Sequence, residues 1–140
     1  MTDDGWKKFR AEPDAYDEIR DYIMARADEA GIGVKDQLRL ELGLEEAIVN
    51  VINYSGSDDI WIKMSDGDGF TVEIVDRGVP FNPLEKYDAR AVDTSNIEER
   101  EIGGFGIAFM RKKFSKLEYS NEQFMGARAN HLTLQFVPND

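Results

Sequence analysis

Two segments of the chain carry apolar residues at the spacing of an amphipathic helix. The first begins at Pro13 and is expected to end at Gly31 and Gly33, with an apolar side made of Ile19, Tyr22, Ile23, Ala27 and Ala30. The second runs from about Val34 to Tyr54, and its core-facing stripe consists of Leu40, Leu44, Ala47 and Val51. The pattern therefore predicts two consecutive helices, each with one buried face.

Shorter segments have the alternation or the apolar content of strands. Five strands are expected, at residues 6–10, 60–65, 70–75, 116–120 and 131–137. The turn residues 66–69 should join the second and third of these in a hairpin, and a third helix is expected at about 104–114. Helices grouped early and strands linked by hairpins favour an α+β fold, a two-layer sandwich with helices on one face of a mixed, mostly antiparallel sheet.

Length and composition favour one domain with a substantial core. The chain has 140 residues, of which 41% are hydrophobic, so we expect a single domain over residues 1–140. It has no cysteine, which excludes disulfides, thiol catalysis and thiolate zinc sites. The sequence shows no apolar run long enough to span a membrane and no secretory signal, so a cytoplasmic location is expected.

The formal net charge of −11 argues against direct binding to nucleic acid or to an anionic membrane. The densest basic group is interpreted as a solvated helix face, and it consists of Arg111, Lys112, Lys113 and Lys116. An anionic ligand such as a nucleotide would therefore need a metal ion, a helix terminus or a few well-placed cations.

The second helix carries a polar stripe beside its apolar one. Glu46, Asn50 and Tyr54 are spaced four residues apart, which places a carboxylate and a carboxamide within reach of one ligand. A solvated helix face is the alternative interpretation. Asn is a poor helix former, and its position between Val49 and Val51 favours a functional role.

Two glycine-containing segments follow. The apolar strand at 70–75 leads into Asp76-Arg77-Gly78, where a carboxylate could accept a hydrogen bond from an exocyclic amine and glycine permits a close backbone approach. An ordinary turn is the alternative. Gly103-Gly104-Phe105-Gly106 then opens the predicted third helix, where backbone N–H groups could face phosphate oxygens, unless this is only a flexible loop.

Two further features are not interpreted as metal sites. The segment 66–77 resembles a calcium loop only at its start, because Phe70 and Arg77 occupy ligand positions. His131 has no second ligand at metal spacing, which makes a zinc site or a Ser-His-Asp hydrolase unexpected.

In this order, the three segments resemble the N box and the two glycine boxes of the GHKL (Bergerat-fold) ATPases, which include gyrases, sensor histidine kinases and anti-sigma-factor serine kinases. The resemblance spans Glu41 to Tyr119. The phrases Leu44-Glu45-Glu46-Ala47-x-x-Asn50 and Asp76-x-Gly78-x-Pro80-Phe81-Asn82-Pro83 are similar to the small anti-sigma serine/threonine kinases of the RsbW type in particular.

The resemblance implies ATP and Mg²⁺ as cofactors. Asn50 would hold the magnesium ion, Asp76 would bind the adenine amino group, and Gly78 would let the backbone close on the base. The remaining phosphate-binding residues would be Gly104 and Gly106, beneath an ATP lid at residues 86–103.

The resemblance also implies catalysis and partners. Glu46 would orient or deprotonate the hydroxyl of a partner's serine or threonine. The expected partners are a STAS-type anti-sigma-factor antagonist, which would be phosphorylated, and a sigma factor, which would be sequestered. Whether the chain forms a homodimer is left open.

Two departures from the family pattern bear on activity. The family often has His where this chain has Tyr54, and its lid usually carries Arg where this chain has Ile102, so Arg100 is expected to substitute. These departures favour an alternative, an ATP-binding regulatory protein of the same fold without kinase activity. A sensor histidine kinase is not expected, because the only histidine is His131.

Overall fold

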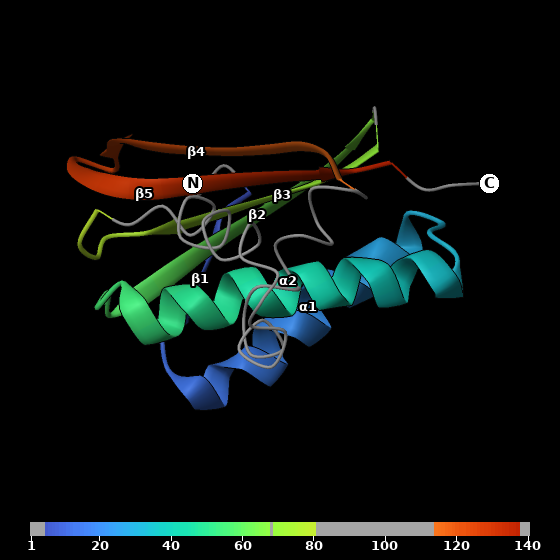
Figure 1. Ribbon diagram of the computed structural model, residues 1–140, viewed down its shortest axis with the longest axis horizontal. Helices are drawn as coiled ribbons and strands as arrows, with labels where there is room; N and C mark the ends of the chain where they lie inside the picture. The colour runs from blue at the N-terminus through green and yellow to red at the C-terminus, as the bar shows by residue number, and fades with distance from the viewer. Residues whose placement is uncertain (1–4, 68, 81–113, 138–140) are drawn as a thin grey trace, which may run out of the picture.

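The structure is a computed structural model, and it describes residues 5–67, 69–80 and 114–137. Two helices lie side by side against one face of a sheet, as Figure 1 shows. In chain order, the elements are β1 (Lys7–Arg10), the 3₁₀ turn η1 (Pro13–Ala15), α1 (Tyr16–Glu29), α2 (Val34–Tyr54), β2 (Asp59–Gly67), β3 (Gly69–Asp76), β4 (Phe114–Phe124) and β5 (Ala127–Phe136). The predicted α+β sandwich is therefore confirmed.

The sheet has five strands in the order β1-β2-β3-β5-β4. Each of the four pairings in the described part of the chain is antiparallel, which agrees with the mostly antiparallel sheet expected. Gly67 pairs with Gly69 at the end of the β2–β3 register, which confirms the predicted hairpin. Because side chains alternate between the faces of a strand, β3 directs Ile74 and Asp76 to the helix-covered inner face and Glu73 and Val75 to the outer face.

The main core fills the space between the helices and the inner face of the sheet. The apolar stripe predicted for α2 is buried, with no residue of it more than 4% exposed. It packs with the buried side chains of α1 and of the sheet, among them Ile19, Ile23, Ile62, Ile74 and Leu134. Burying such side chains is the dominant favourable contribution to folding, at about 1.5–3 kcal/mol each.

The end of α1 is set by glycine, as predicted. Gly31 has a φ of +87°, a conformation that costs glycine little. The N–H of Gly31 donates to the carbonyl of Asp28, and the N–H of Ile32 donates to that of Ala27. These two hydrogen bonds form a Schellman motif, which ends the helix and turns buried Ile32 toward the core.

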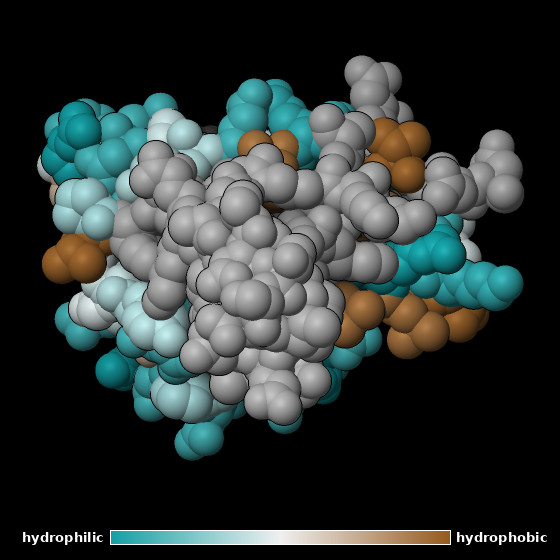
Figure 2. All heavy atoms as spheres, viewed as in Figure 1, coloured by the Kyte–Doolittle hydropathy of each residue, from teal (hydrophilic) through white to brown (hydrophobic). Residues whose placement is uncertain are grey.

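The helix α2 also has an exposed apolar surface near its start. Its side chains Val34, Leu38 and Leu42 are 75%, 60% and 55% exposed, and Figure 2 shows apolar surface over this part of the molecule. The three residues are four positions apart, so they form one continuous stripe on the helix. We call it the α2 apolar stripe.

Several predicted elements are confirmed and others fall outside the described residues. The edge strand at 6–10 is β1, and the two helices have the expected limits. The four later strands extend beyond their expected ends by one to four residues, except that β5 ends one residue early, at Phe136. The predicted helix at 104–114 and the predicted lid at 86–103 lie outside the described residues, except for Phe114. That residue begins β4, and Lys116, expected near a helix face, is also in this strand.

Candidate functional site

The polar stripe of α2 is held together by one side-chain pair. Asn50 is 4% exposed and its Nδ2 donates to Oε2 of Glu46 at 2.9 Å and to the main-chain carbonyl of the same residue. The amide nitrogen therefore faces Glu46, and the carboxamide oxygen points away from it. The pair fixes the rotamer of both side chains, while Tyr54, one turn further, is 49% exposed.

The carboxylate of Asp76 is buried where β3 ends. Asp76 is 3% exposed, and its Oδ1 accepts hydrogen bonds from the N–H of Gly78 at 2.8 Å and from Nδ2 of Asn130 at 3.0 Å. The Ser55 hydroxyl also hydrogen bonds to this carboxylate. Burial raises the pKa of Asp76, and these three hydrogen bonds act in the opposite direction. The result is a dry, oriented acceptor on the inner face of the sheet.

Gly78 approaches the end of α2 so closely that no side chain fits there. A Cβ at this position would lie 2.0 Å from the carbonyl oxygen of Ser55 and 2.5 Å from its carbon. The next residue, Val79, donates its N–H to the same oxygen at 2.8 Å. The turn after Asp76 is therefore packed against α2, which gives this glycine a structural role. Its predicted approach to an adenine base stays a prediction.

Asn130 is a site residue that the sequence analysis missed. It is 4% exposed, lies opposite Asp76 in the β3–β5 register, and also donates to the carbonyl of Val79 at 2.8 Å. Its Oδ1 accepts from the hydroxyl of Tyr119 and from Nδ2 of Asn121 at 3.2 Å. No sequence signal marked it, because Asn130 precedes the strand expected at 131–137 and its partners lie in other strands.

These groups line up along the second half of α2. Asn50 follows Glu46 by four residues and precedes Ser55 by five, which is about 6 Å and about 7.5 Å along a helix axis. Because Ser55 contacts Asp76, the structure brings Glu46, Asn50 and Asp76 to the same end of α2. The other predicted nucleotide-binding residues, Arg100, Gly104 and Gly106, lie outside the described residues.

The donor and acceptor groups present fit a magnesium nucleotide. An exocyclic amine requires an acceptor, which Asp76 supplies, and the oxygen of Asn50 is of the ligand type that Mg²⁺ prefers. In the described part of the chain, no group of three or more His, Cys, Asp or Glu residues is arranged to hold a metal ion. A magnesium ion carried by phosphates requires only one or two protein ligands, so a single Asn50 is compatible with it.

Comparison with known proteins assigns the family. The family model described as histidine kinase-like ATPase domain matches residues 9–136, which include every described helix and strand except the first two residues of β1. A search of curated proteins found no match at the required significance. Among the described residues, no helix is long and apolar enough to cross a membrane. The match agrees with the GHKL resemblance and implies ATP binding, and the chain belongs to the histidine kinase-like ATPase domain family.

Proposed function

We propose that this protein is an ATP-dependent serine/threonine kinase that phosphorylates an anti-sigma-factor antagonist and also sequesters a sigma factor, in the cytoplasm. The observation that carries the proposal is the Glu46–Asn50 pair. It places a carboxylate one helical turn from the residue that would hold magnesium, and phosphoryl transfer needs little more than positioning, a metal and one base.

In this proposal, different residues bind the adenine base, the magnesium ion and the phosphates. Asp76, oriented by Asn130 and the turn at Gly78, accepts the hydrogen bond of the adenine amino group. The oxygen of Asn50 is a ligand of Mg²⁺, which when bound neutralises charge on the phosphates. Gly104, Gly106 and Arg100 are proposed to bind the phosphates on the strength of the family resemblance alone.

Glu46 is proposed to act on the attacking hydroxyl of the partner's serine or threonine. Its carboxylate is held by the amide of Asn50, so it can accept a hydrogen bond from that hydroxyl in a fixed orientation. Proton transfer to this carboxylate would leave the hydroxyl oxygen ready to attack the terminal phosphate, so that a new O–P bond forms while the bond between that phosphate and the ADP leaving group breaks.

The α2 apolar stripe supports a protein substrate over a small molecule. Its last residue, Leu42, precedes Glu46 by one helical turn, so a protein seated on the stripe would reach the carboxylate. Exposed apolar side chains in a continuous row are typical of surfaces that contact other proteins. They also favour a partner that binds through an apolar surface and not through charge alone.

A second candidate is an ATP-binding regulatory protein of the same fold that transfers no phosphate. Tyr54 favours this candidate, because it occupies the position of the family's frequent histidine and is half exposed, and so does Ile102 in place of the lid arginine. Labelled phosphate transfer separates the two. The protein is incubated with γ-labelled ATP, magnesium and the partners that copurify with it. Label on a partner's serine or threonine supports the kinase, whereas ATP binding without transfer to any copurified partner supports the second candidate.

A further inference from the structure

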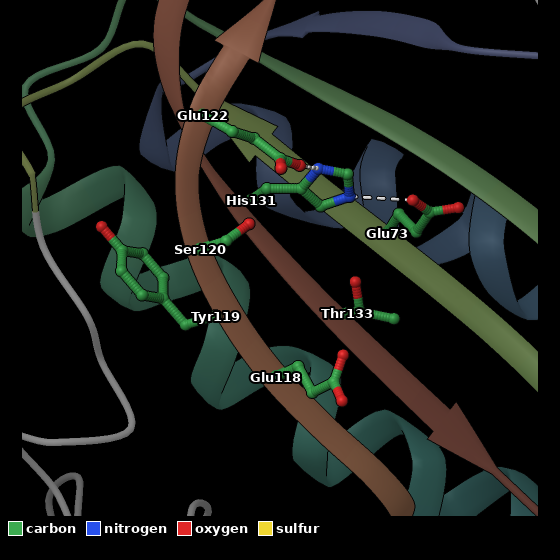
Figure 3. Close-up of a pocket in the computed structure, with 7 residues that line it drawn as sticks. All are labelled: Glu73, Glu118, Tyr119, Ser120, Glu122, His131 and Thr133. Carbon is green, nitrogen blue, oxygen red and sulfur yellow. Dashed lines mark hydrogen bonds and ion pairs between the residues drawn. The ribbon is translucent and has the colours of Figure 1, made fainter.

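A charged cluster lies on the outer face of the sheet, directly behind the candidate site. The ring of His131 in β5 stands between two carboxylates, with Nε2 at 2.8 Å from Oε1 of Glu73 in β3 and Nδ1 at 2.8 Å from Oε2 of Glu122 in β4 (Figure 3). The register places Val75 and Ser120 directly opposite His131, so both ion pairs run diagonally across neighbouring strands. One imidazole thus connects three strands.

This geometry favours the imidazolium form. A neutral imidazole has one N–H and one lone pair, so it could donate to only one of the two carboxylates and would direct its lone pair at the other. Protonation supplies a donor on both sides. In agreement, the hydrogen bond to Glu73 and the two nearby carboxylates raise the pKa of His131, and the same contact lowers the pKa of Glu73.

The other neighbours of the ring are of mixed charge. The indole of Trp6 meets the ring edge to face at 5.9 Å, and Lys63 and Lys116 add positive charge near Glu73. A cavity of about 420 Å³ lies beside the ring, and Glu118, Ser120 and Thr133 line it together with Glu73, Glu122 and His131. Glu118 pairs with Lys116 at 3.7 Å. Of these charged groups, only Glu73 and Glu122 contact the ring nitrogens.

The residue before His131 is Asn130, which holds Asp76 on the inner face. The amide of Asn130 joins the same three strands as the imidazole does, through Asp76 in β3 and through Tyr119 and Asn121 in β4. Side chains of consecutive residues in a strand point to opposite faces, so the imidazole of His131 and the amide of Asn130 hold the same short segment of β5 from its two sides. His131 on the outer face and Asn130 on the inner face therefore both connect β5 to β3 and β4 at the same place in the sheet.

We propose that protonated His131 is a positioning residue for the nucleotide site, because its two ion pairs keep the Asn130 amide against Asp76, and that nucleotide affinity falls as His131 loses its proton. The inference rests on the proposed function of this site in binding ATP. Partly exposed ion pairs contribute modestly, so we expect the protonated protein to bind about three- to tenfold more tightly than the neutral one.

The test uses the fact that the chain has one histidine. Its ring C–H signals in an NMR spectrum of the full chain report His131 alone, and they are followed from about pH 5.5 to about pH 9 with and without magnesium adenylyl imidodiphosphate. Linkage requires that a nucleotide that prefers the protonated form raises the pKa of His131 by the logarithm of the affinity ratio. Calorimetric affinities across the same pH range should fall in the wild type as the ring deprotonates.

Three variants separate positioning from a merely structural role. His131→Gln should bind weakly at every pH and lose the histidine-linked part of the profile. Glu122→Gln, at an exposed position that should not affect folding, should lower the pKa of His131 and move the loss of affinity to lower pH. Glu118→Gln is the matched control, on the same strand and cavity, and should leave both unchanged.

Each outcome is decisive. Nucleotide binding with a His131 pKa that is the same with and without nucleotide, or a pH profile that His131→Gln leaves intact, overturns the inference and leaves the proposed function standing. An absence of nucleotide binding by the wild type at any pH overturns the proposed function, and the inference with it.

Discussion

Asn130 donates a hydrogen bond to Asp76 across the β3–β5 pair, with 3.0 Å between Nδ2 and Oδ1. The two residues are direct partners in the register and both are buried on the inner face. The amide therefore does two things at once: it offsets part of the cost of burying a carboxylate, and it fixes the direction in which that carboxylate accepts hydrogen bonds. A ligand that binds Asp76 meets an acceptor that is already oriented.

Replacing Asp76 with Asn should weaken nucleotide binding strongly and keep the fold. Losing a charged acceptor for a buried partner costs roughly 1.5–3 kcal/mol, which is a tenfold to hundredfold loss of affinity. Because burial raises the pKa of Asp76, a neutral amide of the same size should not lower the stability of the free protein. Isothermal titration with magnesium-ATP measures the affinity, and circular dichroism checks the fold. Unchanged affinity in the folded variant would refute the nucleotide assignment.

Gly78→Ala should destabilise the protein even without nucleotide. The new methyl group would overlap the carbonyl oxygen and the carbonyl carbon of Ser55. These two atoms belong to the backbone at the end of α2, so they cannot rotate away as a flexible side chain could. We expect a loss of about 2 kcal/mol or more in the free energy of unfolding. Urea denaturation of the free protein measures it. A variant of wild-type stability that binds ATP weakly would instead assign Gly78 to the ligand alone.

Gly78 illustrates what the sequence could and could not predict. Asp-x-Gly after an apolar strand predicts either a turn or a ligand site, and the structure contains the turn, in which the Gly78 N–H donates to the Asp76 carboxylate. What the sequence did not indicate is that the glycine packs on Ser55, some twenty residues earlier, because that contact depends on how α2 lies on the sheet. Local sequence patterns predict the local backbone conformation, whereas contacts between residues far apart in the chain depend on how the elements pack together.

The same distinction explains the other outcomes. The limits of α2 could be predicted, because the apolar period, Gly33 and the turn residues after Tyr54 are all local signals. Asn130 and His131 could not be assigned, since their partners are in strands far apart in the chain, and one asparagine or one histidine has no spacing to recognise. The sequence shows no second metal ligand at a suitable spacing from His131, whereas the partners of this ring in the structure are two carboxylates across the strands.

The stability of the wild type should depend on pH through His131 and Glu73. The folded-state pKa of His131 is raised, so its contribution is complete below the ordinary histidine value of about 6.5 and is lost as pH rises through the folded value. The folded-state pKa of Glu73 is lowered, so its contribution is present above the ordinary glutamate value and is lost as pH falls through the folded one.

Denaturation at a series of pH values checks this expectation. Stability should be greatest between the two limits and should fall on the alkaline side by about 1 kcal/mol, the size of a partly exposed ion pair. In His131→Gln the loss of stability at alkaline pH should be smaller, because only the other titrating groups then contribute to it. An identical loss of stability at alkaline pH in wild type and variant would contradict the assignment of this loss to deprotonation of the His131 imidazolium.

The exchange of Glu46 for Gln separates a kinase from an ATP-binding protein. Gln keeps the size of the side chain, and its amide oxygen can still accept the hydrogen bond from Nδ2 of Asn50, so magnesium-ATP affinity should stay close to that of the wild type. It cannot take a proton at neutral pH. Positioned general bases contribute a factor of roughly 10² to 10⁴, and phosphate transfer to the partner's serine should fall by that order.

Glu45 is the matched control for this exchange. It is adjacent in sequence but exposed. Burial and, after it, the charges of Glu45 and Glu41 raise the pKa of Tyr16, which places the Glu45 charge near α1 and away from the Asn50 side of the helix. Glu45→Gln should therefore leave both ATP affinity and transfer close to wild type.

The measurement is the initial rate of labelled transfer at saturating ATP, for wild type and both variants. A Glu45→Gln protein without transfer beside an active Glu46→Gln protein would reassign the base. If both variants transfer phosphate at the wild-type rate, no glutamate of this pair acts on the hydroxyl, and positioning and the metal alone must account for catalysis.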